Sequence, residues 1–544
     1  MPDLPAVMPA ASRFEPPWNR QRLRVPRSDR SLLAQPSLPN AVDAARANAA
    51  RLNDCSLSLQ GRTLSRLREW TRQEVFRAAG EYTALLRGAP VAATGDGLVF
   101  VGGHQPSLFH PGVWAKNFAI GEMAARAGGV ALHLIIDNDT LSTTRLRVPT
   151  GDRAQPVIDA VAFDADRPAQ PWEEAAVLDP ALFDSFAERV AEPMRSWGVR
   201  PLLLEMWPDA AAHFQEHASP QAASLRDGLC AARHRLERRW GLNNLELPLS
   251  RLCALDPFLW FTGHVLAHLE RFRRIHNDVL REYRRVNRVR SRTHPVPELA
   301  AADDWHEAPF WVWRAGQQQR GRLFARQQGR EVQLSDGRET FAVLPLHADM
   351  DACCAVEVLR TLPQQGIRLR TRALTTTLYA RLCLADLFVH GIGGAKYDEM
   401  TDHIIARYFG IGPPRFQTLS ATVRLPLAEP WNVTAADERR LEALLRDLDY
   451  NADRHLPHDT DDDTRALIEE KQRLIAAQHA ARETEQPRSA RQIARRANYT
   501  RHRRFQEING QLAERAEGQR RRIEDELHAV RRQRAANAVL TDRE

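Results

Sequence analysis

The sequence predicts an α/β protein with a parallel-sheet core, and three neighbouring segments carry this prediction. Leu98–Val101 is a short apolar run that ends in two glycines, as a buried strand entering a tight turn does. A helical pattern follows over Pro111–Arg126, and a second apolar run covers Val130–Ile136. Strand, glycine turn, helix and strand in this order form one βαβ unit. We therefore expect a Rossmann-like core.

The other segments are expected to complete and surround this core. Residues 1–40 are rich in proline, arginine and serine, and Asn40–Arg87 has a helical pattern. The expected divisions are an N-terminal lead-in with helices at 1–90, the first half of the core at 91–150, an insertion at 151–345, the second half of the core at 346–430 and a helical coiled-coil arm at 431–544.

The insertion combines several patterns. Pro201–Met206 predicts an apolar strand, and Asp256–Arg290 predicts a long helix. Alternating apolar and polar residues over Arg320–Val343 predict a small β-rich portion. Three tryptophans are expected to belong to its core rather than to a stacking platform: Trp305, Trp311 and Trp313.

The second half of the core leads into the helical arm. Leu374–Val389 is apolar at helical spacing, His390–Lys396 is expected to form a turn, and a helix is expected to run on to Phe409. Thr434 and Asp437 have the spacing of a capping box. A heptad seam predicts an α-helical hairpin or coiled coil through Phe505, Ile508, Leu512, Ala516, Ile523 and Val530.

Composition narrows the class of protein. Hydrophobic residues make up 43% of the 544 residues, and no run approaches the roughly 18 apolar residues that a membrane helix needs. The N-terminal segment lacks the apolar centre of a signal peptide, so we expect a cytoplasmic location and no membrane partner. The six cysteines include no CxxC pair and are expected to be buried, reduced thiols.

The net charge of +7 comes mainly from the C-terminal tail. Residues 485–544 contain 15 arginines and nine acidic residues, so the rest of the chain is close to neutral. A solvated helical face explains such a tail better than a nucleic-acid site does. Nucleic acid is therefore not expected as a partner.

Lysine is almost absent from this chain. Only Lys116, Lys396 and Lys471 occur among 76 basic residues. An ammonium is a compact point charge whose pKa shifts readily, whereas a guanidinium is a planar fork that stays charged. Because two of the three lysines lie in glycine-rich segments, we expect the working site between Gly102–Lys116 and Gly391–Glu399.

The first glycine-rich segment follows the first predicted strand. Gly102 and Gly103 allow the backbone to approach a ligand closely, and the next helix presents free N–H groups at its N-terminus. Phosphate or carboxylate groups are suited to such a place. His104 and His110 would add hydrogen-bond donors to a developing negative charge. The alternative is a structural turn with a surface histidine.

Two carboxylates follow the second predicted strand. Asp137 and Asp139 would point in similar directions if the strand continues through them, with Asn138 facing the other way. Such a pair would hold a ribose, an amine or a divalent cation, or act as a general base. Ordinary turn formation and helix capping explain the same residues.

The second glycine-rich segment combines flexible backbone with charge. Gly393 and Gly394 would let Lys396 reach a bound phosphate while Asp398 and Glu399 accept hydrogen bonds from an amine or hydroxyl. The alternative is a loop whose charges pair with one another and with Arg372. His455, His458 and Asp459–Asp463 have metal-ligand residue types, but a solvated cap of the next helix explains them better.

The order of these motifs resembles that of the bacillithiol-biosynthesis cysteine-adding enzymes, also called cysteine ligases. The resemblance covers most of residues 95–420. His104 and Gln105 stand where that family has the two glutamines of a GQQ-x-G-L-type turn, and Lys116 lies in a helix where the family also carries a lysine.

The other two motifs of that family follow in order. Asp137 and Asp139 correspond to the carboxylates of its EDHD-type strand end, with Asn138 at the histidine. Gly393 and Gly394 correspond to the glycines of its IGGPGE-type turn, whereas residues 395–399 depart from its Pro-Gly-Glu continuation.

The resemblance implies a core like that of class I aminoacyl-tRNA synthetases, with a connecting-peptide insertion and a coiled coil that forms a homodimer. It implies a ligase that joins cysteine to the amine of an amino-sugar malate conjugate, with an amino acid and an amine acceptor as substrates and ATP or ADP as cofactor. The residue types leave the metal requirement open.

The implied roles follow the motifs. His104, Lys116 and Lys396 would stabilise phosphate or an oxyanion, and Asp137 and Asp139 would orient or deprotonate the amine with support from Glu399. The residues implied in binding substrate or nucleotide are Gly102, Gly103, Gln105, Lys116, Asn138, Arg372, Gly393, Gly394 and Asp398. Two alternatives stay open: another nucleotide-dependent small-molecule transferase on the same core, and a non-catalytic dimeric scaffold.

Overall fold

The computed structural model describes residues 14–18, 23–86, 97–108, 110–216, 224–457, 459–483 and 491–541. The chain divides into two compact units. The first comprises Met1–Arg147, Ala160–Glu192 and Arg200–Leu425, and the second comprises Val148–Asp159, Pro193–Val199 and Pro426–Glu544.

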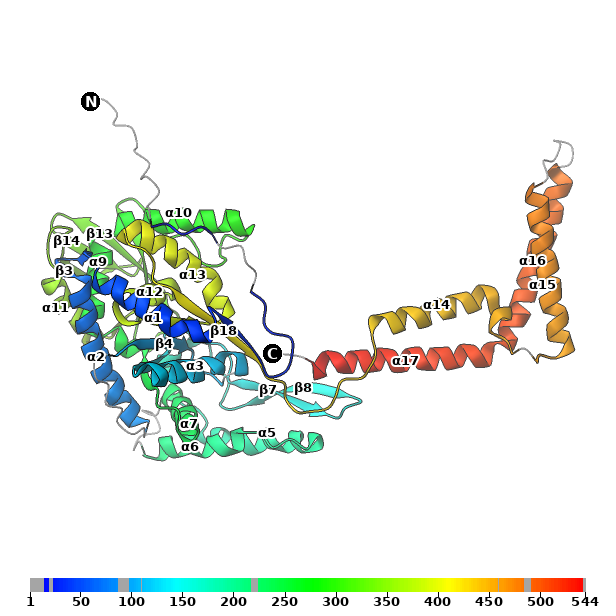
Figure 1. Ribbon diagram of the computed structural model, residues 1–544, viewed down its shortest axis with the longest axis horizontal. Helices are drawn as coiled ribbons and strands as arrows, with labels where there is room; N and C mark the ends of the chain where they lie inside the picture. Colours follow the sequence, from blue (N-terminus) through cyan, green and yellow to red (C-terminus); the bar gives the residue numbers. More distant parts are fainter. Residues whose placement is uncertain are drawn as a thin grey trace, which may run out of the picture. The chain divides into compact units, whose positions relative to one another are not determined.

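A six-stranded, mostly parallel sheet forms the centre of the first unit (Figure 1). Its strand order is β1 (Ser31–Gln35), β18 (Phe416–Thr422), β17 (Leu387–His390), β4 (Val99–His104), β5 (Val130–Ile135) and β10 (Leu245–Pro248). Only the edge strand β1 is antiparallel to its neighbour within this sheet. The predicted βαβ unit is confirmed as β4, α3 (Pro111–Ala127) and β5.

Helices cover both faces of this sheet. Phe100 of β4 packs with α1 (Leu38–Asn53) and α3 on one face. Val99 and Val101 point to the other face, in a cluster with α2 (Leu64–Leu85) and α9 (Asp256–Ala267). Strands buried on both faces read as continuous apolar runs, which is why the sequence reveals β4 and β5 clearly.

The turn from α3 into β5 needs its two glycines. Gly128 ends α3 with a left-handed φ of 61°, and a Cβ on Gly129 would lie 2.2 Å from the carbonyl oxygen of Leu98. The strands therefore approach as closely as they do only because residue 129 has no side chain.

A second, antiparallel sheet confirms the predicted β-rich portion. It contains β11 (Ala301–Ala302), β12 (Trp305–Arg314), β13 (Gly321–Gln328), β14 (Glu331–Ser335) and β15 (Thr340–Pro345) in that order, with β16 (Ile367–Thr371) on the other side of β12. The end of β16 leads directly into α12 (Ala373–Tyr379), so this sheet positions the start of that helix.

The strand predicted at Pro201–Met206 is wrong. Helix α6 (Leu203–Glu216) begins there, because the buried side chains of Leu203, Met206, Trp207 and Ala210 recur at helical spacing. The strand that this region contributes to the main sheet is β10 instead.

The helix predicted over Leu374–Val389 is only partly right. Helix α12 continues as a π-helix over Ala380–Leu384, and the chain then enters the sheet as β17. The turn predicted at His390–Lys396 is also wrong, since α13 (Ile392–Ile404) begins directly after Gly391. A buried strand of four residues is too short to reveal its period beside a helix.

Three other predictions need smaller corrections. The helical segment at 40–87 is two helices, α1 and α2, separated by the hairpin of β2 (Ser58–Leu59) and β3 (Arg62–Thr63). The long helix at 256–290 is α9 followed by α10 (Leu269–Asn287). The segment expected to be a lead-in supplies the edge strand β1.

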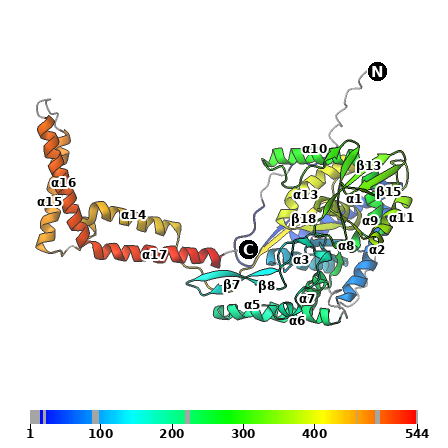
Figure 2. The ribbon, with the colours of Figure 1, turned by 180° about the vertical axis from the view of Figure 1, so that it is seen from behind.

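The second unit contains the four C-terminal helices α14 (Ala435–Asn451), α15 (Asp462–Glu483), α16 (Arg491–Arg515) and α17 (Glu517–Leu540). Helix α15 lies beside α16, and α14 beside α17, in both views (Figures 1 and 2). The predicted capping box at Thr434 is present. Most seam residues are buried between these helices: Ile508, Leu512, Ala516, Ile523 and Val530.

The remaining strands and α-helices lie between β5 and α12 in the sequence. They are β6 (Thr140–Leu141), β7 (Arg145–Gly151), β8 (Pro156–Ala162), β9 (Gln170–Pro171), α4 (Pro180–Asp184), α5 (Phe186–Met194), α7 (Leu225–Arg239), α8 (Leu249–Leu252) and α11 (Cys353–Thr361). None of the helices in the described ranges is long and apolar enough to span a bilayer.

All six cysteines are free thiols, as predicted, but they are not all buried. Cys353 and Cys354 are exposed at the start of α11, because only the side of this helix that carries Ala355 and Val356 faces the core.

We predict that Gly129→Ala lowers the free energy of unfolding by about 1–3 kcal/mol, because the added methyl group would overlap the Leu98 carbonyl. Urea denaturation of the full chain measures this change. Gly80→Ala in α2 is the matched control, since a Cβ there meets open space and a helical alanine is favoured over glycine. Equal destabilisation by both substitutions would contradict the close approach at Gly129.

Candidate functional site

A cavity lies at the carboxyl ends of β4 and β17. From β4 the chain continues to β5 and β10 on one side, whereas β17 and β18 lie on the other side. Where connections diverge in this way, an open α/β sheet leaves a crevice that binds ligands. The cavity has a volume of about 620 Å³ and is lined by His104 and His390, the last residues of the two strands. This size suits a small molecule.

The cavity brings together parts of both glycine-rich segments. Of the predicted site residues, those that line it are Gly103, His104, Gln105, Lys116, Asn138, Asp139, Arg372, Gly393 and Gly394. The segments around 103 and 393 are nearly 300 residues apart in sequence, and the pairing of β4 with β17 makes them neighbours.

Lys116 is the most unusual of these residues. It lies on α3, is 5% exposed, and its Nζ donates a hydrogen bond to the carbonyl oxygen of Gly103 at 2.7 Å. Among the described residues this is its one hydrogen-bond partner, although an ammonium has three donors. Burial lowers the pKa of Lys116 to about 8. An anion in the cavity would therefore relieve an unpaired buried charge.

The N-terminus of α13 opens onto the same cavity. Gly391 is its N-cap and provides no side chain to bond the first N–H groups of the helix. Gly393 and Gly394 line the cavity in this first turn. Free N–H groups at the positive end of a helix dipole favour a phosphate or carboxylate.

Asp139 is the acidic group of the cavity. Its Oδ2 accepts a hydrogen bond from Gln105 Nε2 at 2.8 Å, and its Oδ1 lies 3.3 Å from the Arg320 guanidinium. Arg320 also donates to the carbonyl oxygen of Asn138 at 2.9 Å. The amide of Asn138 bonds the Thr371 carbonyl at 2.8 Å, which ties the end of β5 to β16.

Two arginines flank a tryptophan at one wall. The guanidinium carbons of Arg372 and Arg320 lie 4.4 and 4.9 Å from the ring centre of Trp311. Arg372 is bonded to the buried carboxylate of Glu307 at 2.7 Å, and its Nε is buried without a hydrogen-bond partner among the described residues. Trp311 thus lines the cavity, whereas its neighbour Trp313 is buried as predicted.

The histidines of the cavity are neutral. Burial and the nearby Lys116 lower the pKa of His104 to about 3. Burial also lowers the pKa of His390, although Asp398 opposes this. Positive charge in the cavity therefore comes from Lys116 and the two arginines rather than from imidazolium groups.

Asp137 does not reach the cavity. Strand β5 ends at Ile135, so the expected alternation of Asp137 and Asp139 is lost. Asp137 is fully buried, and its carboxylate is bonded to Arg226 at 2.6 Å and to the backbone of Ser250 at 2.9 Å. This pairing anchors α7 and α8 to the end of β5.

Lys396 and Glu399 are also outside this cavity, and the reason is the helix. Residues 393, 394, 397, 401 and 404 face the cavity, whereas residues 392, 395, 396, 399, 402 and 403 line a separate cavity on the other side of α13. The expected flexible loop would have allowed Lys396 to reach a ligand beside Gly393. A regular helix separates them by its 3.6-residue period.

Two further predicted residues are internal. Gly102 lies within β4, where a Cβ would contact Ile120 at 3.6 Å. Asp398 is fully buried between His390 and Arg381. Arg372 pairs with Glu307 and not with the charges of 396–399, so the alternative of a self-paired loop is also wrong.

Sequence reasoning missed several lining residues that carry chemistry, among them Trp311, Arg320 and His390. The sequence does carry a signal for His390, because this residue ends a strand directly before a glycine-rich helix start. Trp311 and Arg320 come from the second sheet, and nothing in their local pattern indicates that this sheet faces the cavity.

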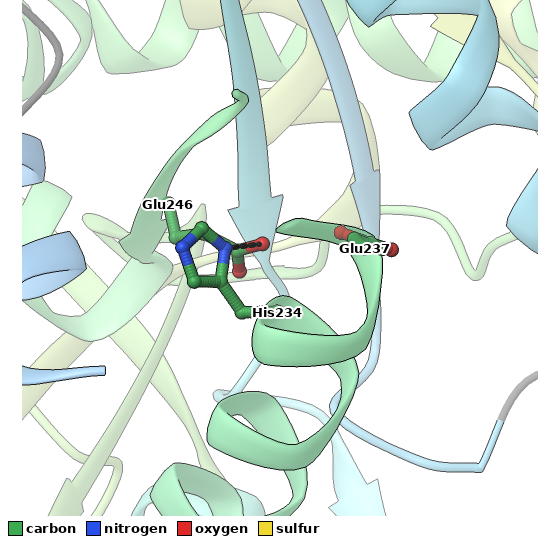
Figure 3. A group of neighbouring side chains, drawn as sticks. All are labelled: His234, Glu237 and Glu246. Carbon is green, nitrogen blue, oxygen red and sulfur yellow. Dashed lines mark hydrogen bonds and ion pairs between the residues drawn. The ribbon is translucent and has the colours of Figure 1, made fainter. Parts of the chain in front are cut away.

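Among the described residues, one buried group has the residue types and spacing of a metal site: His234, Glu237 and Glu246 (Figure 3). His234 and Glu237 lie on α7, and Glu246 lies on β10. The Arg233 guanidinium, however, bonds Glu237 at 2.8 Å and Glu246 at 2.5 and 2.7 Å.

These carboxylates are therefore already paired with a cation. Trp114 and Asn117 donate to the remaining oxygen of Glu237 at 2.6 and 2.8 Å. Although burial opposes it, Arg233 holds the pKa of Glu246 well below its usual value. The group fits a buried ion network that joins α7 to the sheet and not a metal centre.

The histidine–aspartate set at 455–463 has His458 outside the described residues, and His455 bonds Asp447 at 2.9 Å.

We predict that Glu246→Gln destabilises the fold by about 3–5 kcal/mol, because it breaks a buried ion pair and leaves the Arg233 guanidinium undercompensated. Thermal unfolding measures the loss. A chelator such as EDTA should leave the unfolding temperature of the unsubstituted protein unchanged; a lower temperature with EDTA would contradict the ion-network interpretation. Glu122→Gln on the exposed pair with Arg126 is the control with a small effect.

No family model matches this chain, and no curated protein has significant sequence similarity to it. The functional argument therefore depends on the geometry of the cavity.

Proposed function

We propose that this chain is a nucleotide-dependent ligase that forms a carbon–nitrogen bond, on a Rossmann-like core. The nucleotide phosphates would bind in the cavity between β4 and β17. The substrates would be an amino acid and the amine of an amino-sugar conjugate, as the resemblance of the motifs to cysteine-adding enzymes suggests.

One observation carries the proposal: the buried ammonium of Lys116 beside the uncapped N-terminus of α13. A positive charge with two unused donors, in a cavity also lined by Gly393 and Gly394, is a site for a polyanion. The strand order β18-β17-β4-β5-β10 supports it, because it is the order of doubly wound nucleotide-binding sheets with the cavity at the switch point.

The residues present fit a nucleoside triphosphate. Lys116 and the N–H groups at the start of α13 would hold phosphate oxygens, and Trp311 also lines the cavity. When bound, the nucleotide would supply the activation that turns a carboxylate into an acyl donor. Water would be excluded by the apolar lining, which includes Val113, Ile136 and Phe272.

The polar groups away from Lys116 suit the two substrates. Asp139, held by Gln105 and Arg320, would accept hydrogen bonds from an amine or hydroxyl. Arg372 would hold a carboxylate, since its buried Nε is without a hydrogen-bond partner among the described residues. Asp137, Lys396 and Glu399 have no role in this proposal.

We also propose that the C-terminal helices form a coiled-coil dimer arm. Each helix of the α15–α16 hairpin exposes a large side chain: Ile475 of α15 is 37% and Tyr499 of α16 is 71% exposed. A second copy of the hairpin would cover these two side chains. Sedimentation of the full chain and of a Tyr499→Arg variant would test this.

We predict that Lys116→Met weakens ATP and ADP binding at least about tenfold, because it removes a charge-assisted hydrogen bond from a buried site. Isothermal titration calorimetry on the full chain measures the dissociation constants. Lys396→Met is a matched control, because the same residue type is removed from the opposite side of α13.

The control separates the two lysines. Lys396→Met is expected to leave the dissociation constants unchanged, and circular dichroism must show both variants folded. Binding that only Lys396→Met weakens would contradict the assignment to this cavity. No binding at millimolar nucleotide would contradict the nucleotide-dependent proposal and favour a nucleotide-independent transferase or a scaffold.

We predict that nucleotide affinity falls as the pH rises through about 8, because Lys116 binds the anion as an ammonium and its pKa is lowered to about 8. Affinity is at its full value below this pH and decreases by up to about tenfold per pH unit above it. Titrations of ADP between pH 7 and pH 9.5 measure the effect. The Lys116→Met variant should lack this dependence, and an equal slope in both proteins would refute the role of Lys116.

A further inference from the structure

His390 is held in a single orientation at the edge of the cavity. It is the last residue of β17 and is 5% exposed. The ring centres of Phe388 and Phe416 lie 4.6 and 5.1 Å from the centre of the imidazole, and the Phe416 ring is nearly perpendicular to it. Its Nε2 lies 2.9 Å from Oδ2 of Asp398, which is in the middle of α13. The imidazole therefore has little freedom to rotate.

Asp398 is fixed as a carboxylate. Thr377 donates to its Oδ1 and Arg381 to its Oδ2, each at 2.6 Å. Burial would raise its pKa, but Arg381 and His390 hold the pKa of Asp398 well below its usual range. A carboxylate accepts and does not donate, so the bond to Asp398 requires a proton on Nε2 of His390. In the neutral imidazole, Nδ1 is then the lone-pair acceptor.

Nδ1 lies beside the first turn of α13. No residue of the described chain hydrogen-bonds it. A Cβ added to Gly394 would lie 2.9 Å from Nδ1, so glycine at 394 is what leaves room for the imidazole. His390 and Gly394 both line the cavity that also contains Lys116.

We propose that His390 is the proton acceptor of this site and that Asp398 is its positioning residue. The inference rests on the proposed function and adds the group that the amide-forming step needs. An amine nitrogen would attack the activated carboxyl carbon and form the C–N bond. Its proton would pass to Nδ1, and the phosphate-bearing leaving group would depart with the electron pair of the broken C–O bond. The imidazolium would then release its proton to water.

The other basic groups of the site are poorer acceptors. His276 also lines the cavity, but burial lowers its pKa to about 4 and its Nδ1 lies 3.1 Å from Oδ1 of Asn277. His104 has a pKa of about 3, and its Nδ1 lies 3.1 Å from the carbonyl oxygen of Gln105. Asp139 is engaged by Gln105 and Arg320, and Asp137 is buried with Arg226. A base oriented by a carboxylate that is itself anchored is the arrangement that proton-transfer enzymes use.

The protonation state supports this role. The charged groups that face His390 are Asp398 from α13, Arg381 from the π-helix and Lys116 from α3. Burial and the two cations together outweigh Asp398, and the pKa of His390 is lowered from its ordinary value. His390 is therefore an unprotonated acceptor at neutral pH.

The test uses the full chain labelled with ¹⁵N-histidine and an acylating probe. NMR identifies the tautomer of His390, which we expect to carry its proton on Nε2. Diethyl pyrocarbonate acylates the unprotonated nitrogen of accessible imidazoles, and mass spectrometry of peptides measures the rate at each histidine. We expect His390 to be acylated, and ADP to slow this reaction.

Two variants distinguish an oriented base from an exposed side chain. Asp398→Ala removes the acceptor that keeps the proton on Nε2, so the imidazole loses its fixed tautomer and orientation, and acylation at His390 should slow at least about tenfold. Gly394→Ala should slow it by crowding Nδ1. His110, which caps α3, is the internal reference whose rate should not change.

The outcomes separate this inference from the proposed function. An Nδ1–H tautomer in the unsubstituted protein, or the absence of acylation at His390, overturns the inference even if neither variant folds. Acylation that depends on Asp398 but is not slowed by ADP supports His390 as the acceptor and contradicts nucleotide binding. Acylation slowed by ADP supports both.

Discussion

The contact between β4 and β17 depends on one buried carboxylate, that of Asp386. Its Oδ2 accepts the backbone N–H of Val99 at 2.8 Å, and its Oδ1 accepts Arg68 and Arg72 of α2 at 2.7 and 2.6 Å. Two strands distant in sequence and one covering helix therefore meet at a single side chain. Removing one member of such a buried network leaves uncompensated charge. This junction fixes the amino ends of the two strands side by side, and the cavity lies at their carboxyl ends.

Arginine and lysine have different tasks in this molecule. Buried arginines hold carboxylates in forked contacts that join elements, as Arg233 does between α7 and β10 and Arg381 does within the helices behind the cavity. Lys116 instead places a compact charge against one backbone carbonyl and leaves donors for a ligand. Lys471 is buried with Asp453, so scarcity of lysine alone does not mark a site.

The cavity combines a positive wall with neutral histidines, and one cause produces both. Desolvation disfavours charge on every group, so His104 and His390 lose their protons, while arginines and Lys116 keep theirs at neutral pH. Anion binding and proton acceptance can therefore occur a few side chains apart. The ion network of Arg233 and Glu246 differs from this site. Both carboxylate oxygens of Glu246 already have a partner in Arg233.

Local sequence patterns determined the βαβ unit, the capping box at Thr434 and the antiparallel portion, because apolar periodicity and turn chemistry are local. Tertiary structure decided which side chains face the cavity. Because α13 begins at Ile392 and the segment is not a loop, Lys396 lines a different cavity from Gly393. The partners of Asp137 and His390 come from elements far along the chain or from across a helix, and no local pattern encodes such contacts.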